Sequence, residues 1–365
     1  MLATENLREA DRLMTICNAC RYCEGLCAVF PAMEMRRTFS DGDLNYLANL
    51  CHGCGACYTD CQYSPPHEFN VNVPATLAKL RNDSYAAYAW PGAFGGAFAA
   101  NGLVVTSLAA LSIAGFIIGF VANSDPAALW SRNAGDFYKV MPHWAMVAVF
   151  GVASLYVVLS FVMSARAFWR DTAGDEPVGL AAIGRAIADS AHLTYLHGGG
   201  GGCTSETSEP SPQRRIYHHL TFYGFLLCFA ATCVATVYHY AFGWEAPYPV
   251  FSVPVLLGIA GGIGLLVGPT GLFVLLRRRD PILMDLPRRG LNTAFTHMLT
   301  LTSLTGFLLL ILRGTGGMGM LLAVHLGVVL GLFLSLPYGK FVHALYRFAA
   351  LVKYASERKR AAFVE

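Results

Sequence analysis

The sequence predicts a mainly α-helical protein in two parts, a small N-terminal domain followed by a bundle of membrane-spanning helices. Eight of the eleven cysteines fall between residues 17 and 61, whereas the chain beyond residue 90 consists mostly of long apolar runs. The 365 residues are 55% hydrophobic and only 13% charged, about half the charged fraction of an ordinary soluble domain. We expect the parts at residues 1–90, 91–348 and 349–365, the last being a basic tail.

The N-terminal cysteines form a motif that occurs twice. CNACRYCEGLC starts at residue 17, and CHGCGACYTDC repeats its C-x2-C-x2-C-x3-C spacing 34 residues later. Three closely spaced thiolates followed by a fourth are typical of paired [4Fe–4S] clusters, in which the fourth cysteine of each run binds the other cluster. The predicted ligands are Cys17, Cys20, Cys23 and Cys61 for the first cluster, and Cys51, Cys54, Cys57 and Cys27 for the second.

Zinc, disulfides and a thiol redox role are alternative uses of the same cysteines. Zinc needs four ligands and tends to separate its two C-x2-C pairs by a longer loop. Disulfides suit small secreted domains, but the first ninety residues contain no apolar segment typical of a signal peptide. The duplicated motif therefore favours two iron–sulfur clusters over these alternatives.

The segment between the two cysteine runs predicts a helix. Ser40 or Asp41 can cap it, and three leucines follow at helical spacing. Pro31 and Pro65 come four residues after the last cysteine of each run, whereas bacterial ferredoxins have proline directly after it. The N-terminal domain therefore resembles the helical ferredoxin domain of succinate dehydrogenase iron–sulfur subunits more than the strand-rich small ferredoxins.

The rest of the chain contains six runs long enough to cross a bilayer core, which takes about 20 predominantly apolar residues. They are residues 94–122, 142–165, 217–241, 252–276, 291–312 and 318–337. Of the 26 Lys and Arg residues, only Arg132, Lys139 and Arg313 fall in loops on one side of this bundle. Because cytoplasmic loops carry more Lys and Arg, we expect both termini and the cysteine domain in the cytoplasm. The net charge of +3 then reflects topology, and no motif indicates nucleic-acid binding.

One long cytoplasmic loop, residues 170–216, is expected between the second and third spans. Its first half can form an amphipathic helix at the membrane surface. Five glycines follow at 198–202, which indicate either a flexible linker or a backbone that approaches a cofactor or partner closely. Cys203 has no other cysteine at a spacing typical of metal ligands, and we assign it no role. Cys228 and Cys233 lie inside an apolar span, where we expect them to act as small hydrophobic side chains.

Seven histidines lie within or at the edges of the predicted spans, where ionisable side chains are costly and often functional. They are His143, His218, His219, His239, His297, His325 and His343. Bis-histidine binding of b haem needs two imidazoles from facing helices at the same depth. No C-x-x-C-H motif occurs, which excludes covalent c-type haem.

The last span gives the clearest histidine pattern. His325 and His343 are 18 residues apart, so on one continuous helix both face the same side, about 27 Å apart along the axis. The antiparallel third span carries histidines at matching depths. This predicts an outer haem between His239 and His325, and an inner haem between His343 and either His218 or His219.

Helical phase distinguishes the two inner candidates. His218 lies about 60° from the face of His239, whereas His219 lies about 160° away, which favours His218. His297, about two turns into the fifth span, is a competing inner ligand. We expect the side chain of His143, near a helix end, to lie in the lipid headgroup region.

The haem-helix residues carry a resemblance. AVHLGVVLGLFLSLPYGKFVHALYRF, residues 323–348, resembles the last haem helix of the respiratory nitrate reductase gamma subunit, and HYAFG at 239–243 is similar to the end of its other haem helix. The whole chain, with GGGGGC and RRIYHHLTFYGFLLCFAAT, resembles the citrate or tricarballylate utilisation protein B family. The resemblance implies a cytochrome b-like bundle in the bacterial inner membrane. It also implies electron transfer from the FAD of a separate tricarballylate- or citrate-type dehydrogenase to quinone.

The residues themselves favour the same class of function. No G-x-G-x-x-G follows a strand, so we expect no dinucleotide site, and substrate chemistry would reside in another polypeptide. One alternative is a quinol-oxidising subunit that feeds a cytoplasmic heterodisulfide-type reductase, because sequence does not fix the potentials. Another is a tricarboxylate transporter with a redox-sensing head, although the spans show neither a clear repeat nor a cluster of Lys and Arg. Whether the chain counts as an enzyme depends on quinone reduction.

Overall fold

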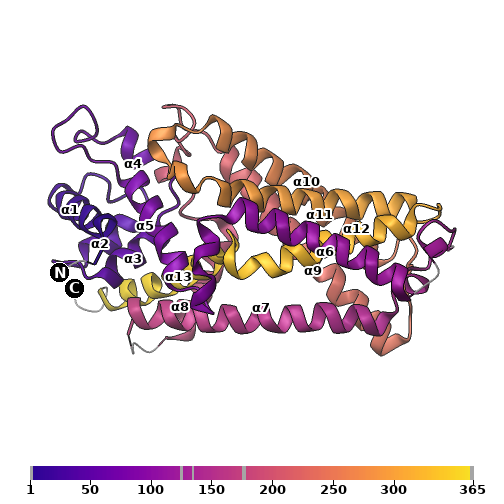
Figure 1. Ribbon diagram of the computed structural model, residues 1–365. Helices are drawn as coiled ribbons and strands as arrows, with labels where there is room; N and C mark the ends of the chain where they lie inside the picture. Colours follow the sequence, from indigo (N-terminus) through magenta and orange to yellow (C-terminus); the bar gives the residue numbers. More distant parts are fainter. Residues whose placement is uncertain (1–2, 124–125, 134, 175–177, 362–365) are drawn as a thin grey trace.

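The computed structural model describes residues 3–123, 126–133, 135–174 and 178–361. Within these residues the regular structure is helical, apart from one isolated bridge between Cys203 and Ser211. Figure 1 shows the short helices of the N-terminal domain gathered at one end, with long helices extending away from them. The predicted fold, mainly α-helical and in two parts, is confirmed.

The N-terminal domain is built from helices, and those that begin at Glu5, Asp41 and Val73 have side-chain caps. The helices are α1 (Glu5–Cys20), α2 (Val29–Glu34), α3 (Asp41–Leu50), α4 (Ala56–Thr59) and α5 (Val73–Ala87). The side chain of Thr4 accepts a hydrogen bond from the backbone of Leu7 at the start of α1. Ser40 and Asp43 form a capping box at the start of α3, which confirms Ser40 as the predicted cap.

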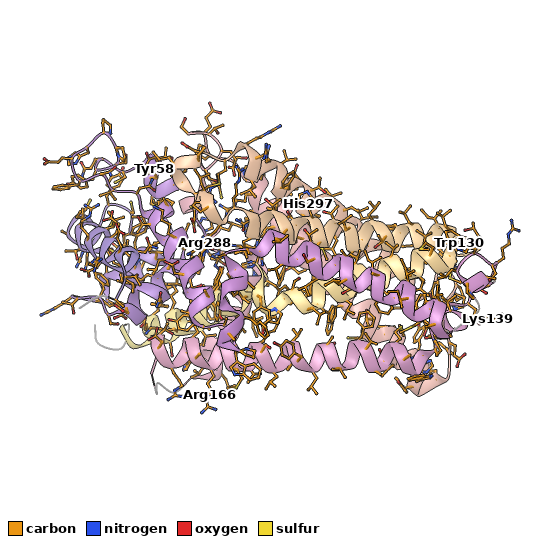
Figure 2. All side chains as sticks on the ribbon, viewed as in Figure 1. Tyr58, Trp130, Lys139, Arg166, Arg288 and His297 are labelled. Carbon is orange, nitrogen blue, oxygen red and sulfur yellow. The ribbon has the colours of Figure 1, made fainter. Side chains whose placement is uncertain are left out.

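In the described residues, six helices are long and apolar enough to cross a membrane. They are α6 (Asn101–Asn123), α7 (His143–Thr172), α9 (Gln213–Phe242), α10 (Val253–Arg278), α11 (Gly290–Leu312) and α12 (Met318–Ser335). The first begins later than expected, because residues 92–98 form the 3-10 helix η1 (Gly92–Phe98). Figure 2 shows Lys139 at the end of the bundle farthest from the N-terminal domain, and Arg166 and Arg288 nearer to that domain. The chain is therefore a multi-pass membrane protein.

Glycines allow neighbouring membrane helices to approach closely. A Cβ atom at Gly224 of α9 would lie 2.9 Å from the carbonyl oxygen of Gly261 of α10. A Cβ atom at Gly331 of α12 would lie 2.7 Å from the Cα of Ala109 of α6. Small residues at such contacts let helix backbones pack without intervening side chains. The bundle therefore pairs α9 with α10 and α6 with α12.

The last membrane helix does not continue to the end of the chain. α12 is followed by η7 (Leu336–Tyr338), and α13 (Val342–Ala361) begins only after Gly339, whose backbone is extended. Pro337 supplies no backbone N–H and disfavours helix at the residue before it. The expectation that His325 and His343 face one side of a continuous helix is therefore wrong, since the two residues lie on separate helices.

α13 packs into the N-terminal domain. The ring of Tyr346 is fully buried and lies 5.7 Å from the ring of Tyr85 in α5 and 5.2 Å from that of Phe168 in α7. Arg36 donates a hydrogen bond of 2.5 Å to Glu357 near the end of α13. α8 (Leu180–His192) also packs along α13. The end of the chain is thus part of one core shared by the domain and the membrane bundle.

Candidate metal centres

The first set of four thiols lines one cavity in the N-terminal domain. Its cysteines are Cys17, Cys20, Cys23 and Cys61. α1 ends at Arg21, whose left-handed backbone (φ 56°) turns the chain back directly after Cys20. Cys61 follows the short helix α4 and completes the set. The cavity therefore joins three cysteines of the first run to the fourth of the second, the arrangement that cross-ligation requires.

The second set of four thiols lines a second cavity. Its cysteines are Cys27, Cys51, Cys54 and Cys57. Gly53 and Gly55 turn the loop between them with φ angles of 59° and 93°, which side chains rarely adopt. A Cβ atom at Gly55 would also lie 3.0 Å from the backbone nitrogen of Ser205. Both glycines are therefore needed where the loop turns and packs.

The cysteines of both cavities are partly or fully buried, and their thiols lie close to one another. Burial, followed by repulsion from the other cysteines, raises the pKa of Cys17 to about 12. The same causes raise the pKa of Cys23 to about 12 and also raise that of Cys57. Thiolates are the form that binds iron, and a bound cation compensates their mutual repulsion. The donor set therefore fits a metal centre in each cavity.

The spacing of the thiols bears on which metal centre fits. Among the described residues, no three or more His, Cys, Asp or Glu side chains surround a point suited to a single metal ion. Tetrahedral zinc would hold four thiolates at about 2.3 Å from one ion. Thiols spread around a cavity instead suit a cluster whose irons each take one thiolate. The four thiols that line each cavity correspond to the two predicted sets of cluster ligands.

The two cavities differ in how far they are covered. Tyr22, which lines the first cavity, is 72% exposed. The second cavity is covered by the glycine-rich loop, in which the backbone nitrogen of Gly199 donates to the carbonyl oxygen of Leu26 at 2.9 Å. The backbone nitrogen of Thr204 donates to the carbonyl oxygen of Cys54 at 2.9 Å. Cβ atoms at Gly199 and Gly202 would lie 2.9 and 2.7 Å from their nearest neighbours, so these two glycines allow the loop to pack closely here, as the second interpretation of the run expects.

Cys203 follows these glycines and lies beside the second cavity. It is 1% exposed, and its thiol is hydrogen-bonded with that of Cys54. Two backbone hydrogen bonds of 2.9 Å with Ser211 hold it there. Cys203 could not be found from motif spacing, because about 150 residues separate it from Cys54.

Two arginines hold the backbone of Cys51. Arg81 of α5 donates a hydrogen bond of 2.7 Å to the carbonyl oxygen of Cys51. Arg347 of α13 donates to the same oxygen, also at 2.7 Å. Burial is the main cause that lowers the pKa of Arg347, to about 10.

Two further arginines hold the next two residues of the same segment. Arg214 of α9 donates to the carbonyl oxygens of His52 and Gly53, at 2.8 and 2.7 Å. Arg279, which follows α10, donates to the carbonyl oxygen of Gly53 at 2.9 Å. Burial, followed by repulsion from Arg214 and Arg81, lowers the pKa of Arg279 to about 9. We call the four residues Arg81, Arg214, Arg279 and Arg347 the basic collar.

His218 and His343 lie together beside this segment. Their rings are nearly perpendicular, and the ring centroids are 6.1 Å apart. Each ring could offer one nitrogen to a b haem held between the two helices. The Nδ1 of His343 donates to the carbonyl oxygen of Lys340 at 2.6 Å, an anchor typical of metal-binding histidine. The buried Nδ1 of His218 has no hydrogen-bond partner. The pair therefore fits bis-histidine binding of b haem.

His52 lies between the second cavity and this pair. It is adjacent to Cys51 in the chain and lines the second cavity. Burial, followed by the charges of Arg347 and Arg214 and the proximity of His218, lowers its pKa. The peptide that carries a predicted cluster ligand therefore reaches the membrane histidines.

The other two inner candidates point elsewhere. The ring of His219 lies 5.8 Å from that of Tyr223 on its own helix. The Nδ1 of His297 donates to the carbonyl oxygen of Thr293 at 2.7 Å, and its ring packs on Phe273. Figure 2 shows His297 on the part of the bundle nearer to the N-terminal domain. Of the three candidate partners, His218 is the one whose described contacts include His343.

The two predicted outer ligands each have a different neighbour. The ring of His239 stacks on that of His143, with centroids 3.9 Å apart. The Nδ1 of His325 forms a hydrogen bond of 2.9 Å with the hydroxyl of Thr305, and its ring fits against Gly306. The structure does not bring His239 and His325 into a described contact, and their pairing stays a prediction.

The sequence analysis used the arginines of the basic collar only to predict the orientation of the chain in the membrane, and it did not predict their contacts with the cysteine segment. A signal for two of them was present in the spacing. Arg214 lies four residues before His218, and Arg347 lies four residues after His343. Residues four apart share one face of a helix, so each arginine accompanies its histidine.

Comparison with known proteins agrees with this arrangement. The family model described as Citrate utilization protein B matches residues 99–363, and that of the Citrate utilization protein B Fer4-like domain matches residues 10–87. Citrate utilization protein B of Escherichia coli is 48% identical over 362 residues, which cover 98% of this chain and 94% of that protein. No solved structure matches the chain. With both of its parts matched, the chain belongs to the citrate utilization protein B family.

Proposed function

We propose that this protein is a membrane electron-transfer subunit that takes electrons from the reduced FAD of a soluble tricarballylate- or citrate-type dehydrogenase and delivers them to quinone. When bound, two [4Fe–4S] clusters and b haem would supply one-electron carriers between the flavin and the quinone. The name of the Escherichia coli relative, citrate utilization protein B, supports a tricarboxylate as the source of the electrons.

One placement supports the proposal: arginines from the helices of His218 and His343 donate hydrogen bonds to the backbone beside the second cysteine cavity. Cys51 is a predicted ligand, and its carbonyl oxygen accepts from Arg347 at 2.7 Å, while that of His52 accepts from Arg214 at 2.8 Å. His218 in turn faces His343 at 6.1 Å between ring centroids. A soluble domain that was only anchored to a membrane would not need contacts that link its cysteine cavity to histidines of the membrane helices.

The first cavity suits the entry of electrons from a soluble partner. It lies on the side of the N-terminal domain formed by the end of α1 and the residues after α4, and exposed Tyr22 lines it. A reduced flavin can therefore approach Cys20 and Cys23 without passing the membrane bundle. From the charge distribution we expect this domain in the cytoplasm, and the proposed role has the bundle in the inner membrane.

Stopped-flow spectroscopy tests the proposed direction. The purified protein is mixed anaerobically with the reduced dehydrogenase. We expect iron–sulfur absorbance to bleach first, b-type bands to appear next, and both to reverse when a quinone analogue is added. His343→Ala should keep the first phase and lose the second, whereas the matched variant His297→Ala should behave as wild type.

The opposite flow would favour the alternative role. Reduction of the haem by quinol, with electrons then appearing on the flavin and no net flow to quinone, contradicts the proposal. That result would support a quinol-oxidising subunit for a cytoplasmic reductase.

A further inference from the structure

The basic collar concentrates buried positive charge around one of the two cysteine cavities. In the described part of the chain, none of its four arginines forms an ion pair with a carboxylate. Their described hydrogen bonds all go to backbone carbonyl oxygens, most of them between residues 48 and 53. Glu206 is the acidic group that offsets the charge of Arg279, although burial and the neighbouring arginines outweigh it.

Buried cations without an anionic partner destabilise a fold. The nearest source of negative charge is the second cavity itself. The thiolate of Cys51 interacts favourably with both Arg279 and Arg347. Four thiolates and a cluster at this place would supply the counter-charge that the collar lacks.

Neither cavity has Arg or Lys in its lining, but in the described part of the chain no comparable set of arginines donates to the backbone of the cysteines of the first cavity. The lining of the first cavity consists of apolar, aromatic and amide side chains besides the cysteines. The nearby Asp60 adds negative charge beside Cys23. Arg21, next to Cys20 in the chain, is exposed, and its side chain donates to the backbone of Asn18. The two sites therefore differ strongly in their electrostatic surroundings.

Reduction of a cluster adds one negative charge to it. Surrounding positive charge stabilises the reduced form more than the oxidised form and so raises the reduction potential. We infer that the basic collar makes the second cluster the one with the higher reduction potential, and therefore the one from which electrons leave toward His218 and His343. This inference rests on the proposed presence of two clusters, and it goes further by ordering them.

A redox titration followed by EPR tests the ordering in the purified holoprotein. The two cluster signals are assigned by their loss in Cys20→Ser and Cys54→Ser. In wild type we expect the signal lost in Cys54→Ser to appear at the higher potential. The opposite order would overturn the inference, whatever the electron donor or acceptor turns out to be.

Variants of the collar test its cause. Arg279→Gln removes a charge, and we expect the ratio of reduced to oxidised second cluster at a fixed potential to fall about tenfold, a shift of about 59 mV for one electron. The first cluster should not shift. Arg279→Lys keeps the charge and should restore the potential, and the distant variant Arg12→Gln should leave both clusters unchanged.

Two outcomes of the variant series would contradict the inference. One is an equal shift of both clusters in Arg279→Gln; the other is an unchanged second cluster in both Arg279→Gln and Arg347→Gln. Iron and sulfide content identifies any variant that fails to assemble, and the wild-type ordering then decides alone. The titration uses mediators and dithionite, so it needs neither the dehydrogenase nor quinone. The stopped-flow experiment tests the proposed function, so its failure can be distinguished from a failure of the predicted order of cluster potentials.

Discussion

Arg347, one helical turn after His343, donates a hydrogen bond of 2.7 Å to the carbonyl oxygen of Cys51. α13 thereby contacts the second cysteine cavity with one side chain and the membrane histidines with another. α13 also contributes Tyr346, Ala350 and Tyr354 to the core of the N-terminal domain. The position of α13 links the predicted ligands of two different cofactors.

The composition of the two cavities predicts which substitutions act on the same cluster. Cys27→Ser should perturb the same EPR signal as Cys54→Ser, because both thiols line the second cavity. Cys20→Ser should perturb the other signal, although Cys20 is nearer to Cys27 in sequence. Loss of one common signal in Cys27→Ser and Cys20→Ser would mean that each run binds its own cluster.

The facing rings of His218 and His343 predict that both hold the inner haem. His218→Ala and His343→Ala should each lower haem per protein, because one imidazole alone leaves the iron without its second axial ligand. The pyridine haemochrome assay measures this. His219→Ala and His297→Ala serve as matched controls and should retain haem. If His297→Ala loses haem while His218→Ala does not, the inner pairing is different.

His325 provides a separate test of the outer haem. Its hydrogen bond to Thr305 leaves Nε2 free for a metal. His325→Ala should remove one haem and leave both clusters in place, with a residual spectrum from the inner site. Full haem content with unchanged bands in this variant would point to a single haem held by His343.

Cys203 is expected to tune the second cluster without binding it. Cys203→Ala should retain iron and sulfide, but the potential of the second cluster should fall. Once Cys54 binds iron as a thiolate it can only accept, so the hydrogen bond that the variant removes is one donated by the thiol of Cys203. Cys233→Ala, an exposed position in α9, is the matched control. Loss of the whole cluster in Cys203→Ala would instead identify Cys203 as a ligand.

The ion pair between Arg36 and Glu357 is expected to stabilise the docking of α13. The side chains are only 11% and 14% exposed, and removing one partner of a buried pair typically costs about 3 kcal/mol or more. Arg36→Gln should therefore lower the midpoint of denaturant unfolding in detergent. Glu9→Gln breaks the exposed pair with Arg12, which is 43% exposed, and should change stability by less than about 1 kcal/mol. Equal effects of the two variants would contradict a buried role for Arg36.

Local patterns predicted much of this architecture. The six spans followed from runs of apolar residues, and the cap at Ser40 from a polar side chain before a helical pattern. The grouping of Cys61 with the first run followed from the chemistry of repeated cysteine motifs. In each case the signal lies within a short stretch of sequence.

Features that depend on contacts between distant segments were not predictable. The basic collar draws arginines from α5, α9, α13 and the loop after α10, and Cys203 reaches Cys54 through a loop packed across the second cavity. The break between α12 and α13 is a partial exception. Pro337 and Gly339 indicated it, but the spacing of the histidines was interpreted as if the helix were continuous.

A single spectroscopic and analytical measurement on the purified protein tests the central claim most directly. A dithionite-reduced minus oxidised spectrum, with iron and sulfide assays, should show b-type bands and about eight cluster irons with about eight sulfides per chain. Adding a quinone analogue should reverse both the haem bands and the iron–sulfur bleaching. Zinc without sulfide, or clusters without b-type bands and without reoxidation by quinone, would contradict the account.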